Sequence, residues 1–230
     1  MRGTENSGTI QRQLFLLLFG LILSVISCKK DSDLSQNPDL GYNYFPVDSG
    51  RWIVYKADSI VHNDFTGTVD TFRFQIMEVM AGDFKDNEGR VSQRLERYKR
   101  ENETSSWKIK DVWWMTKTAT RAEQSEENRR YIKLAFPVKN GQSWDGNALN
   151  TETAQHYSYE DVHEPYQING LSFDSVVTVL QQDQLNIIEK KYSIEKYAKG
   201  VGMVYKEYIS LDFQKDAGVE YTLKIIAYGQ

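Results

Sequence analysis

The chain has 230 residues, of which 40% are hydrophobic and 13% aromatic, and its formal net charge is −4. This composition excludes a disordered chain, and the length suffices for one large β domain or two small ones. The mildly acidic balance, with both signs of charge interspersed along the chain, leaves no electrostatic footprint for nucleic acid, so no nucleic-acid partner is expected.

An uncharged apolar run covers residues 14–26 and follows a segment that contains Arg2 and Arg12. As a helix this run would rise about 20 Å, which is short of the roughly 30 Å hydrocarbon core of a membrane. The length therefore favours a signal peptide over residues 1–27. The alternative is a short anchor helix beside an incidental cysteine.

The only cysteine of the chain, Cys28, stands where this run ends. Val25-Ile26-Ser27-Cys28 resembles a lipobox, although Val25 replaces the commoner Leu and Ile26 is bulky for its position. The resemblance implies cleavage after Ser27 and a diacylglycerol on the Cys28 thiol, with further acylation such as palmitate. Two or more acyl chains anchor a protein stably in a membrane. With one cysteine the chain has no intramolecular disulfide.

Residues 28–43 are rich in Asp, Ser and Lys, which predicts a flexible tether before a single globular domain at 44–230. Lys29-Lys30-Asp31-Ser32-Asp33 resembles the charged tether of lipoproteins from Bacteroidota. That resemblance implies a lipid anchor in the outer membrane and display at the cell surface. A charged tether is also an ordinary solvated linker, so the periplasmic face remains open.

Period-2 alternation recurs through the rest of the chain and predicts about ten strands. They are expected near residues 51–56, 69–80, 90–101, 107–115, 132–136, 154–163, 173–179, 186–197, 203–213 and 219–227. One charged segment, 121–129, reads as a helix or a loop. Strands with one wet face predict an all-β, antiparallel fold, either a barrel-like curled sheet or a β-sandwich.

Two stretches of the chain are similar to each other and suggest two similar halves. Phe45-Pro46-Val47-Asp48-Ser49-Gly50-Arg51-Trp52 matches residues 136–144 with one extra residue before the second Trp. A duplicated half-barrel predicts similar backbone paths at the two places. The alternative is that two strand-entry turns use the same residue types independently.

The motif at 45–55, together with Gly200-Val201-Gly202-Met203-Val204 downstream, resembles uncharacterised lipoproteins and secreted β proteins of bacteria. In this chain Tyr205 stands between the strand-opening element and Lys206. The resemblance implies a fold type and no activity. The two glycines suit a bend or bulge that enters a strand.

The usual signatures of catalysis and metal binding are absent from the sequence. It has no Gly-x-Ser-x-Gly motif, and the three histidines stand beside no suggestive turn. His156 and His163 are an odd number of residues apart, which places them on opposite faces of a strand. We therefore expect no catalytic residue, no metal site and no cofactor.

Two carboxylates share the alternation phase of large apolar residues. Asp111 is in phase with Trp113 and Met115, and Glu207 is in phase with Tyr205 and Ile209. Both are therefore predicted to face the interior, where a charge must be paired or neutralised. They would be paired structural groups, polar groups that face a ligand, or an acid/base pair for glycoside hydrolysis. The paired structural role is the favoured one.

Trp113 and Trp114 are adjacent, so one ring points to each face of the strand. Trp114 is the candidate for an exposed aromatic contact with a glycan or an envelope protein.

These features predict a lipid-anchored cell-envelope protein with a non-catalytic binding or assembly role and an unspecified ligand. The alternatives are a hydrolase that acts on glycans through interior carboxylates, and a lipid carrier or envelope chaperone with a hollow barrel. The packing of the barrel interior distinguishes these three functions. A filled core indicates surface binding, whereas a cavity above about 300 Å³ indicates a carrier or an enzyme.

Overall fold

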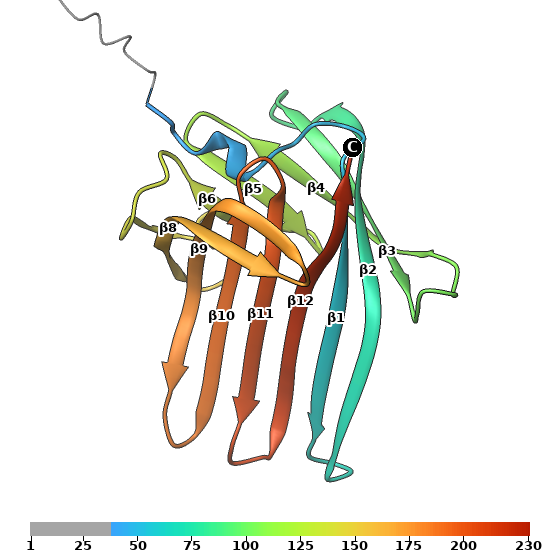
Figure 1. Cartoon of the computed structure of the whole chain (residues 1–230). Coiled ribbons are helices and arrows are strands. Elements are labelled where there is room, and N and C mark those ends of the chain that lie inside the picture. Colours follow the sequence, from blue (N-terminus) through green and yellow to red (C-terminus); the bar gives the residue numbers. More distant parts are fainter. Residues whose placement is uncertain (1–37) are drawn as a thin grey trace, which may run out of the picture. The chain divides into compact units, whose positions relative to one another are not determined.

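The computed structural model describes residues 38–230 (Figure 1). The predicted signal peptide 1–27, the lipidation site Cys28 and most of the predicted tether lie outside the described residues. Within residues 38–230 no helix is long and apolar enough to cross a membrane.

The described chain is built from twelve strands and one short 3-10 helix, η1 (Tyr42–Tyr44). The strands are β1 (Trp52–Asn63), β2 (Thr68–Lys85), β3 (Val91–Arg100), β4 (Lys108–Lys117), β5 (Arg121–Glu126), β6 (Arg129–Ala135), β7 (Ser143–Asp145), β8 (His156–Ile168), β9 (Leu171–Leu185), β10 (Glu189–Ala198), β11 (Gly202–Asp212) and β12 (Ala217–Gly229). The helix considered for residues 121–129 is wrong, because this segment forms β5 and the turn to β6. Ala122, Glu123 and Ser125 are the buried residues of β5.

All neighbouring strands are antiparallel and belong to one sheet in the order β6-β5-β4-β3-β2-β1-β12-β11-β10-β9-β8-β7. The sheet curls until its two edge strands approach each other. Ile132 N of β6 donates to Gly146 O just after β7 at 2.9 Å, and Trp144 Nε1 of β7 donates to Ile132 O at 2.9 Å. The prediction of an all-β, antiparallel, barrel-like fold is confirmed, and the sandwich alternative is not adopted.

The sheet consists of two meanders of six strands, β1–β6 and β7–β12, joined through the β1–β12 pair. Each of the two similar sequence stretches leads into the first strand of a meander. In both stretches, the turn glycine and the residue after it form backbone hydrogen bonds with one residue of the meander's second strand. A duplicated half-barrel predicts this similarity. The bonds are Gly50 N to Met80 O and Met80 N to Arg51 O, both 2.9 Å, and Gly141 N to Tyr159 O and Tyr159 N to Gln142 O, both 3.0 Å.

Both turn glycines have a left-handed backbone, with φ of 88° at Gly50 and 72° at Gly141, which side chains with a Cβ adopt only with strain. The two turns differ at the prolyl bond, which is cis before Pro137.

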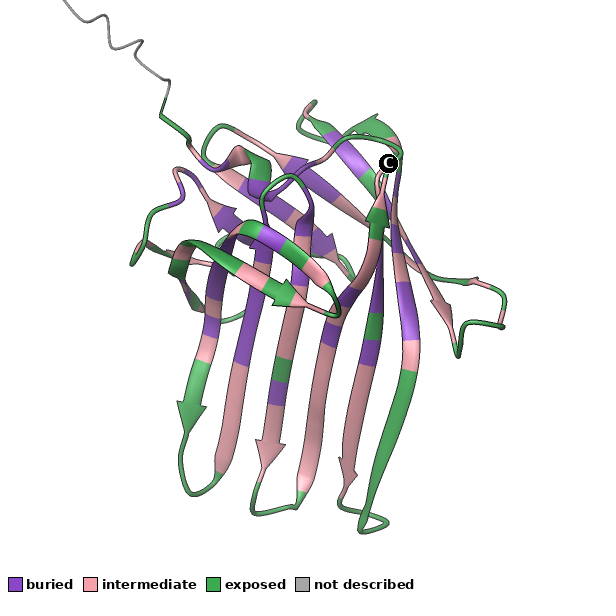
Figure 2. Cartoon of the chain, viewed as in Figure 1, coloured by how far each residue is buried: buried purple, intermediate pink, exposed green. Residues whose placement is uncertain are grey.

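The upper part of the barrel is filled with apolar and aromatic side chains. One buried cluster contains Met80, Leu95, Met115, Leu134 and Val177 from both meanders. Tyr44 and Phe45, which precede β1, pack into the same cluster. Figure 2 shows that the buried residues gather in this upper part, whereas the lower ends of β1, β2 and β9–β12 are half-buried or exposed.

Residues 39–43, which the sequence assigned to the tether, contact the barrel. Asp39 pairs with Lys199, Val138 N donates to Leu40 O at 3.1 Å, and Gly200 N donates to Asn43 O at 2.7 Å. These bonds hold residues 39–43 against the top of the barrel.

Candidate functional site

Asp111 takes the paired role expected of it. The Arg97 guanidinium lies between two carboxylates, with Nη1 3.1 Å from Asp111 Oδ1 and Nε 2.9 Å from Glu78 Oε1. Arg97 also lies over the ring of Trp113, 3.6 Å from its centroid. Burial raises the pKa of Glu78, and the Arg97 charge opposes that effect. Asp111 therefore belongs to a structural ion cluster.

The strand that carries Asp111 does not alternate throughout as the sequence suggested. The pairing of β3 with β4 skips Lys110, so a β-bulge separates Asp111 from Ile109. Ile109, which unbroken alternation would place on the same face as Asp111, is 59% exposed.

Glu207 has no basic partner among the ion pairs of residues 38–230, so the paired role expected of it is wrong. Its carboxylate accepts a hydrogen bond from Tyr205 at 2.9 Å and is half-buried. The pairing of β10 with β11 skips Val204, so a bulge follows Gly202 and reverses the expected phase. Lys206 points into the barrel, and Glu207 therefore lies on the opposite, outer face. Asp111 and Glu207 do not form a joint site.

Trp114 is half-buried. It borders a groove of about 530 Å³ beside Gly82, Phe84, Arg94 and Val112. A role of this side chain in glycan or protein contact stays a prediction.

A second ion cluster crosses the barrel below the apolar core, and the sequence did not reveal it. Lys133 Nζ of β6 lies 2.7 Å from Glu195 Oε1 of β10 and 3.2 Å from Glu126 Oε1 of β5. Lys206 Nζ of β11 lies 3.0 Å from the same Glu195 oxygen. Tyr197 donates to Glu195 Oε2 at 2.6 Å. We call Glu126, Lys133, Glu195 and Lys206 the cross-barrel ion cluster.

Another bulge explains why sequence alternation missed Lys133. The pairing of β5 with β6 skips this residue, so Lys133 turns inward between Ile132 and Leu134. The inward orientation of Glu195 could have been predicted from its position two residues before Tyr197, because residues i and i+2 lie on the same face of a strand.

The charges of the cross-barrel ion cluster stabilise one another. Burial raises the pKa of Glu195, but the ammonium groups of Lys133 and Lys206 outweigh it and lower the pKa to about 2. The pKa of Glu126 is lowered in the same way. Burial lowers the pKa of Lys133, and the two carboxylates more than reverse this. A general acid for glycoside hydrolysis needs a raised pKa, so these carboxylates do not suit that role.

Three members of the cross-barrel ion cluster, Glu126, Lys133 and Lys206, form the floor of a polar cleft of about 590 Å³, and their partner Glu195 is fully buried. Its walls come from β5 and β6, from the segment between β7 and β8, and from β8, β9, β10 and β11. This volume is above the roughly 300 Å³ that is expected to indicate a carrier or an enzyme in place of surface binding, and it lies in the range of about 300–1,000 Å³ common for clefts that bind small molecules. The side chains that the argument below uses are Gln155, Gln181, Gln182, Ser193, Tyr208 and Ser210.

One polar side chain in the wall of the cleft has unused hydrogen-bonding capacity. Gln181 is 5% exposed, and its Oε1 accepts from Ser193 Oγ at 2.8 Å, whereas its Nε2 has no partner. If the side-chain amide of Gln181 is rotated by 180°, Nε2 contacts Ser193 Oγ and Oε1 takes the position without a partner. One polar atom of this amide is therefore unpaired in either orientation. An unpaired buried donor or acceptor costs about 1–3 kcal/mol.

Elsewhere the barrel interior is closely packed. A cavity of about 40 Å³ lies between Tyr55, Met80, Met115 and Tyr197. This volume suits a few water molecules at most. It is far too small for an acyl chain, and the larger cleft is polar, so neither space fits a lipid carrier with a hollow apolar barrel.

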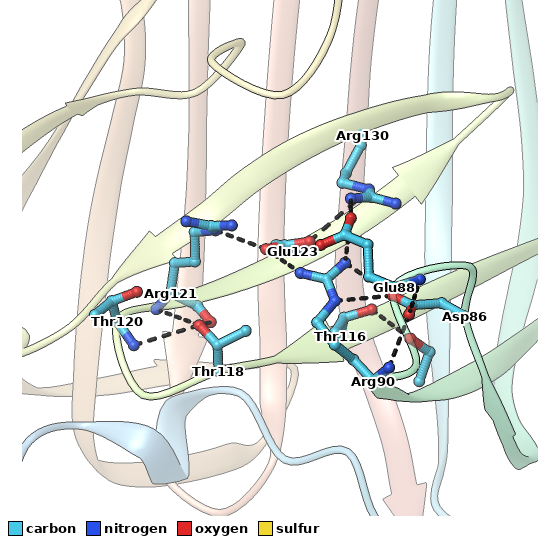
Figure 3. A network of polar contacts seen from close by, with 10 residues as sticks. Asp86, Glu88, Arg90, Thr116, Thr118, Thr120, Arg121, Glu123 and Arg130 are labelled. Carbon is cyan, nitrogen blue, oxygen red and sulfur yellow. Dashed lines mark hydrogen bonds and ion pairs between the residues drawn. The ribbon is translucent and has the colours of Figure 1, made fainter.

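A third group of charges lies around Glu123, which is 1% exposed (Figure 3). Arg121 Nε and Arg90 Nη1 lie 2.6 Å and 3.1 Å from Glu123 Oε1, and Arg130 Nε lies 3.8 Å from Oε2. Asp86 in the β2–β3 turn also binds Arg90. This network fastens the turn to β5 and β6, and its side chains do not line the cleft.

Within residues 38–230 no group of three or more His, Cys, Asp or Glu residues could hold a metal ion. His163 is used otherwise, since its Nδ1 lies 2.6 Å from the hydroxyl of Tyr44.

No protein-family model matches the chain, and no curated protein is similar to it in sequence. Two solved structures are similar to it. One, from Bacteroides fragilis, is described as an exported protein with a YmcC-like fold, with 12% identity and a TM-score of 0.36. The other, from Parabacteroides distasonis, is described as a lipoprotein, with 13% identity and a TM-score of 0.39. Each similarity covers 80% of this chain and 98% of the other.

Proposed function

We propose that this chain is a lipid-anchored protein of the bacterial cell envelope that binds a small polar ligand in the polar cleft next to the cross-barrel ion cluster, without catalysing its conversion. The observation that carries the proposal is the combination of an open cleft of about 590 Å³ with a rigid, fully paired ionic floor. Rigid polar walls favour binding because little side-chain entropy is lost when the ligand enters.

The anchor in this proposal rests on the lipobox-like Val25-Ile26-Ser27-Cys28 and the charged residues after it. Outer-membrane attachment and surface display are the finer parts of the proposal. They follow from the resemblance of the tether to lipoproteins of Bacteroidota.

The absence of catalysis in this proposal is supported by the state of the carboxylates. Hydrolysis of a glycosidic bond uses one protonated and one ionised carboxyl group. The lysines of the cluster favour ionised Glu126 and Glu195, and Asp111 and Glu78 are both bound to Arg97 and do not line the cleft.

A panel of small compounds tests whether the cleft binds a ligand. The purified protein is heated with amino acids, dipeptides, neutral oligosaccharides or acidic oligosaccharides at millimolar concentration. A compound that binds the folded state raises Tm. Ser210→Trp should fill the cleft and remove the increase, whereas Ser172→Trp, on an exposed position of β9, should keep it. If no compound raises Tm, or if Ser210→Trp leaves the increase intact, the cleft is not the binding site.

A further inference from the structure

The charged side chains that line the cleft are already paired with one another. This matters for the ligand, because an ion would find no free counter-charge there. The pairs are Lys133 with Glu126 and Glu195, Lys206 with Glu195, Arg129 with Glu152 at 3.2 Å, and Lys191 with Glu189 at 2.6 Å.

The other polar side chains of the lining are neutral amides and hydroxyls, which both donate and accept hydrogen bonds, and some of this capacity is already used between them. Gln155, Gln181 and Gln182 lie together, with Gln155 Nε2 3.1 Å from the carbonyl oxygen of Gln181. Ser193 and Ser210 add hydroxyls on the neighbouring strands. Amides and hydroxyls complement ligand hydroxyls, which also donate and accept. The unpaired amide atom of Gln181 gives this wall a specific need for such a partner.

One aromatic ring provides a flat apolar surface beside these groups. Tyr208 of β11 is 38% exposed and lines the cleft. Its neighbours across the strands are Ser193 of β10 and Tyr221 of β12. Aromatic rings with one accessible face provide rigid contact area at low entropic cost. The C–H face of a sugar ring is the matching surface among hydroxyl-rich ligands.

The cleft is elongated along β10 and β11, because successive inward residues of both strands line it. Tyr208 and Ser210 follow Lys206 on the inward side of β11, and on the antiparallel strand β10 Ser193 pairs with Tyr208 and Lys191 with Ser210. Successive inward residues on a strand are about 6.6 Å apart. This arrangement suits a ligand that repeats a polar unit along its length.

We infer that the cleft binds an uncharged, linear carbohydrate, with Gln181 hydrogen-bonded to the sugar and Tyr208 stacked on a sugar ring. This inference rests on the proposed function, because it names the ligand class of the same cleft. An amino acid or a phosphorylated compound would bring charges that the paired cleft does not balance.

Calorimetric titration tests the ligand class. The purified full chain is titrated with neutral hexasaccharides of glucose, mannose, galactose and xylose in α and β linkage, with oligogalacturonate, and with dipeptides. We expect a neutral hexasaccharide to bind most tightly. Stronger binding of oligogalacturonate or of a dipeptide would overturn the inference of an uncharged carbohydrate while leaving the proposed function standing. If none of these compounds binds, both fail.

Two variants locate the recognition. Tyr208→Ala should weaken binding of the neutral hexasaccharide about tenfold, whereas Tyr208→Phe keeps the ring and should stay within about twofold. Gln181→Leu should also weaken binding about tenfold. Ser172→Trp is the control that leaves the affinity unchanged. Unchanged affinity in both Tyr208→Ala and Gln181→Leu would overturn the inference, and circular dichroism of each variant shows whether it is folded.

Discussion

Lys133 Nζ lies 2.7 Å from Glu195 Oε1, and this contact joins β6 of one meander to β10 of the other across the barrel. Both side chains are almost fully buried. The pair and its neighbour Lys206 therefore connect the two halves of the barrel with charges that have little access to water.

Removing the shared carboxylate should destabilise the protein strongly. Glu195→Ala leaves Lys206 without its partner and Lys133 with Glu126 alone. We expect a loss of about 3–5 kcal/mol in the free energy of unfolding, because charges are left buried and uncompensated. Chemical denaturation measures it.

Glu207→Ala is the matched control on the adjoining strand. It should cost about 1 kcal/mol or less, since Glu207 accepts one hydrogen bond from Tyr205 and has no basic partner in the described chain. If the two variants lose equal stability, the assignment of these two glutamates is wrong.

The stability of the protein should fall with acid in a defined range. The pKa of Glu195 drops from its ordinary value of 4.5 to about 2 in the folded state, so the unfolded chain takes up this proton first. The resulting stabilisation, on the order of 3 kcal/mol, is complete above about pH 4.5 and is lost as the pH falls toward 2.

Denaturation curves of the parent protein and of Glu195→Gln between pH 5 and pH 2 measure this effect. The variant should show a flatter dependence of stability on pH. Parallel curves would contradict the lowered pKa of Glu195.

Arg97 should matter more to stability than either of its partners alone. Arg97→Ala leaves Glu78 and Asp111 without their shared counter-charge and uncovers Trp113, so we expect a loss of about 3–5 kcal/mol. Asp111→Asn keeps the Arg97–Glu78 pair and should cost only about 1 kcal/mol.

Urea denaturation of both variants tests the order. A second change, Glu78→Gln, should recover part of the loss in Arg97→Ala, since it removes a buried charge. A larger loss from Asp111→Asn than from Arg97→Ala would refute this view of the cluster.

Membrane attachment should depend on one thiol. Cys28→Ala removes the residue that the lipobox-like motif marks for acylation, so the protein should lose metabolic labelling with palmitate and leave the membrane fraction. Retention of the variant on membranes after washing without detergent would show that residues 14–26 are the anchor.

Alternation predicted the fold class because most strands have one wet face, and period 2 survives wherever the ladder is regular. It predicted the buried pairing of Asp111 for the same reason. The repeated Phe-Pro turn suggested two similar halves, and in the structure each copy stands before the first strand of a meander.

The cross-barrel ion cluster could not be predicted by alternation. Bulges at Lys110, Lys133 and Val204 each shift the phase by one residue, and nothing in the local sequence announces them. They turn Lys133 inward and place Glu207 on the outer face. The cleft is lined by strands that are distant in the chain, β5 and β6 on one side and β10 and β11 on the other, so no local sequence pattern predicts its lining.

The most direct test of the account is a nuclear magnetic resonance titration of the isotopically labelled protein with the compound that raises Tm most. We predict that the shifted backbone amides cluster in residues 129–133, 152–157, 181–193 and 206–210, which surround the cleft. Shifts centred on the groove beside Trp114, or no shifts at saturation, would contradict the claim that the polar cleft is the binding site.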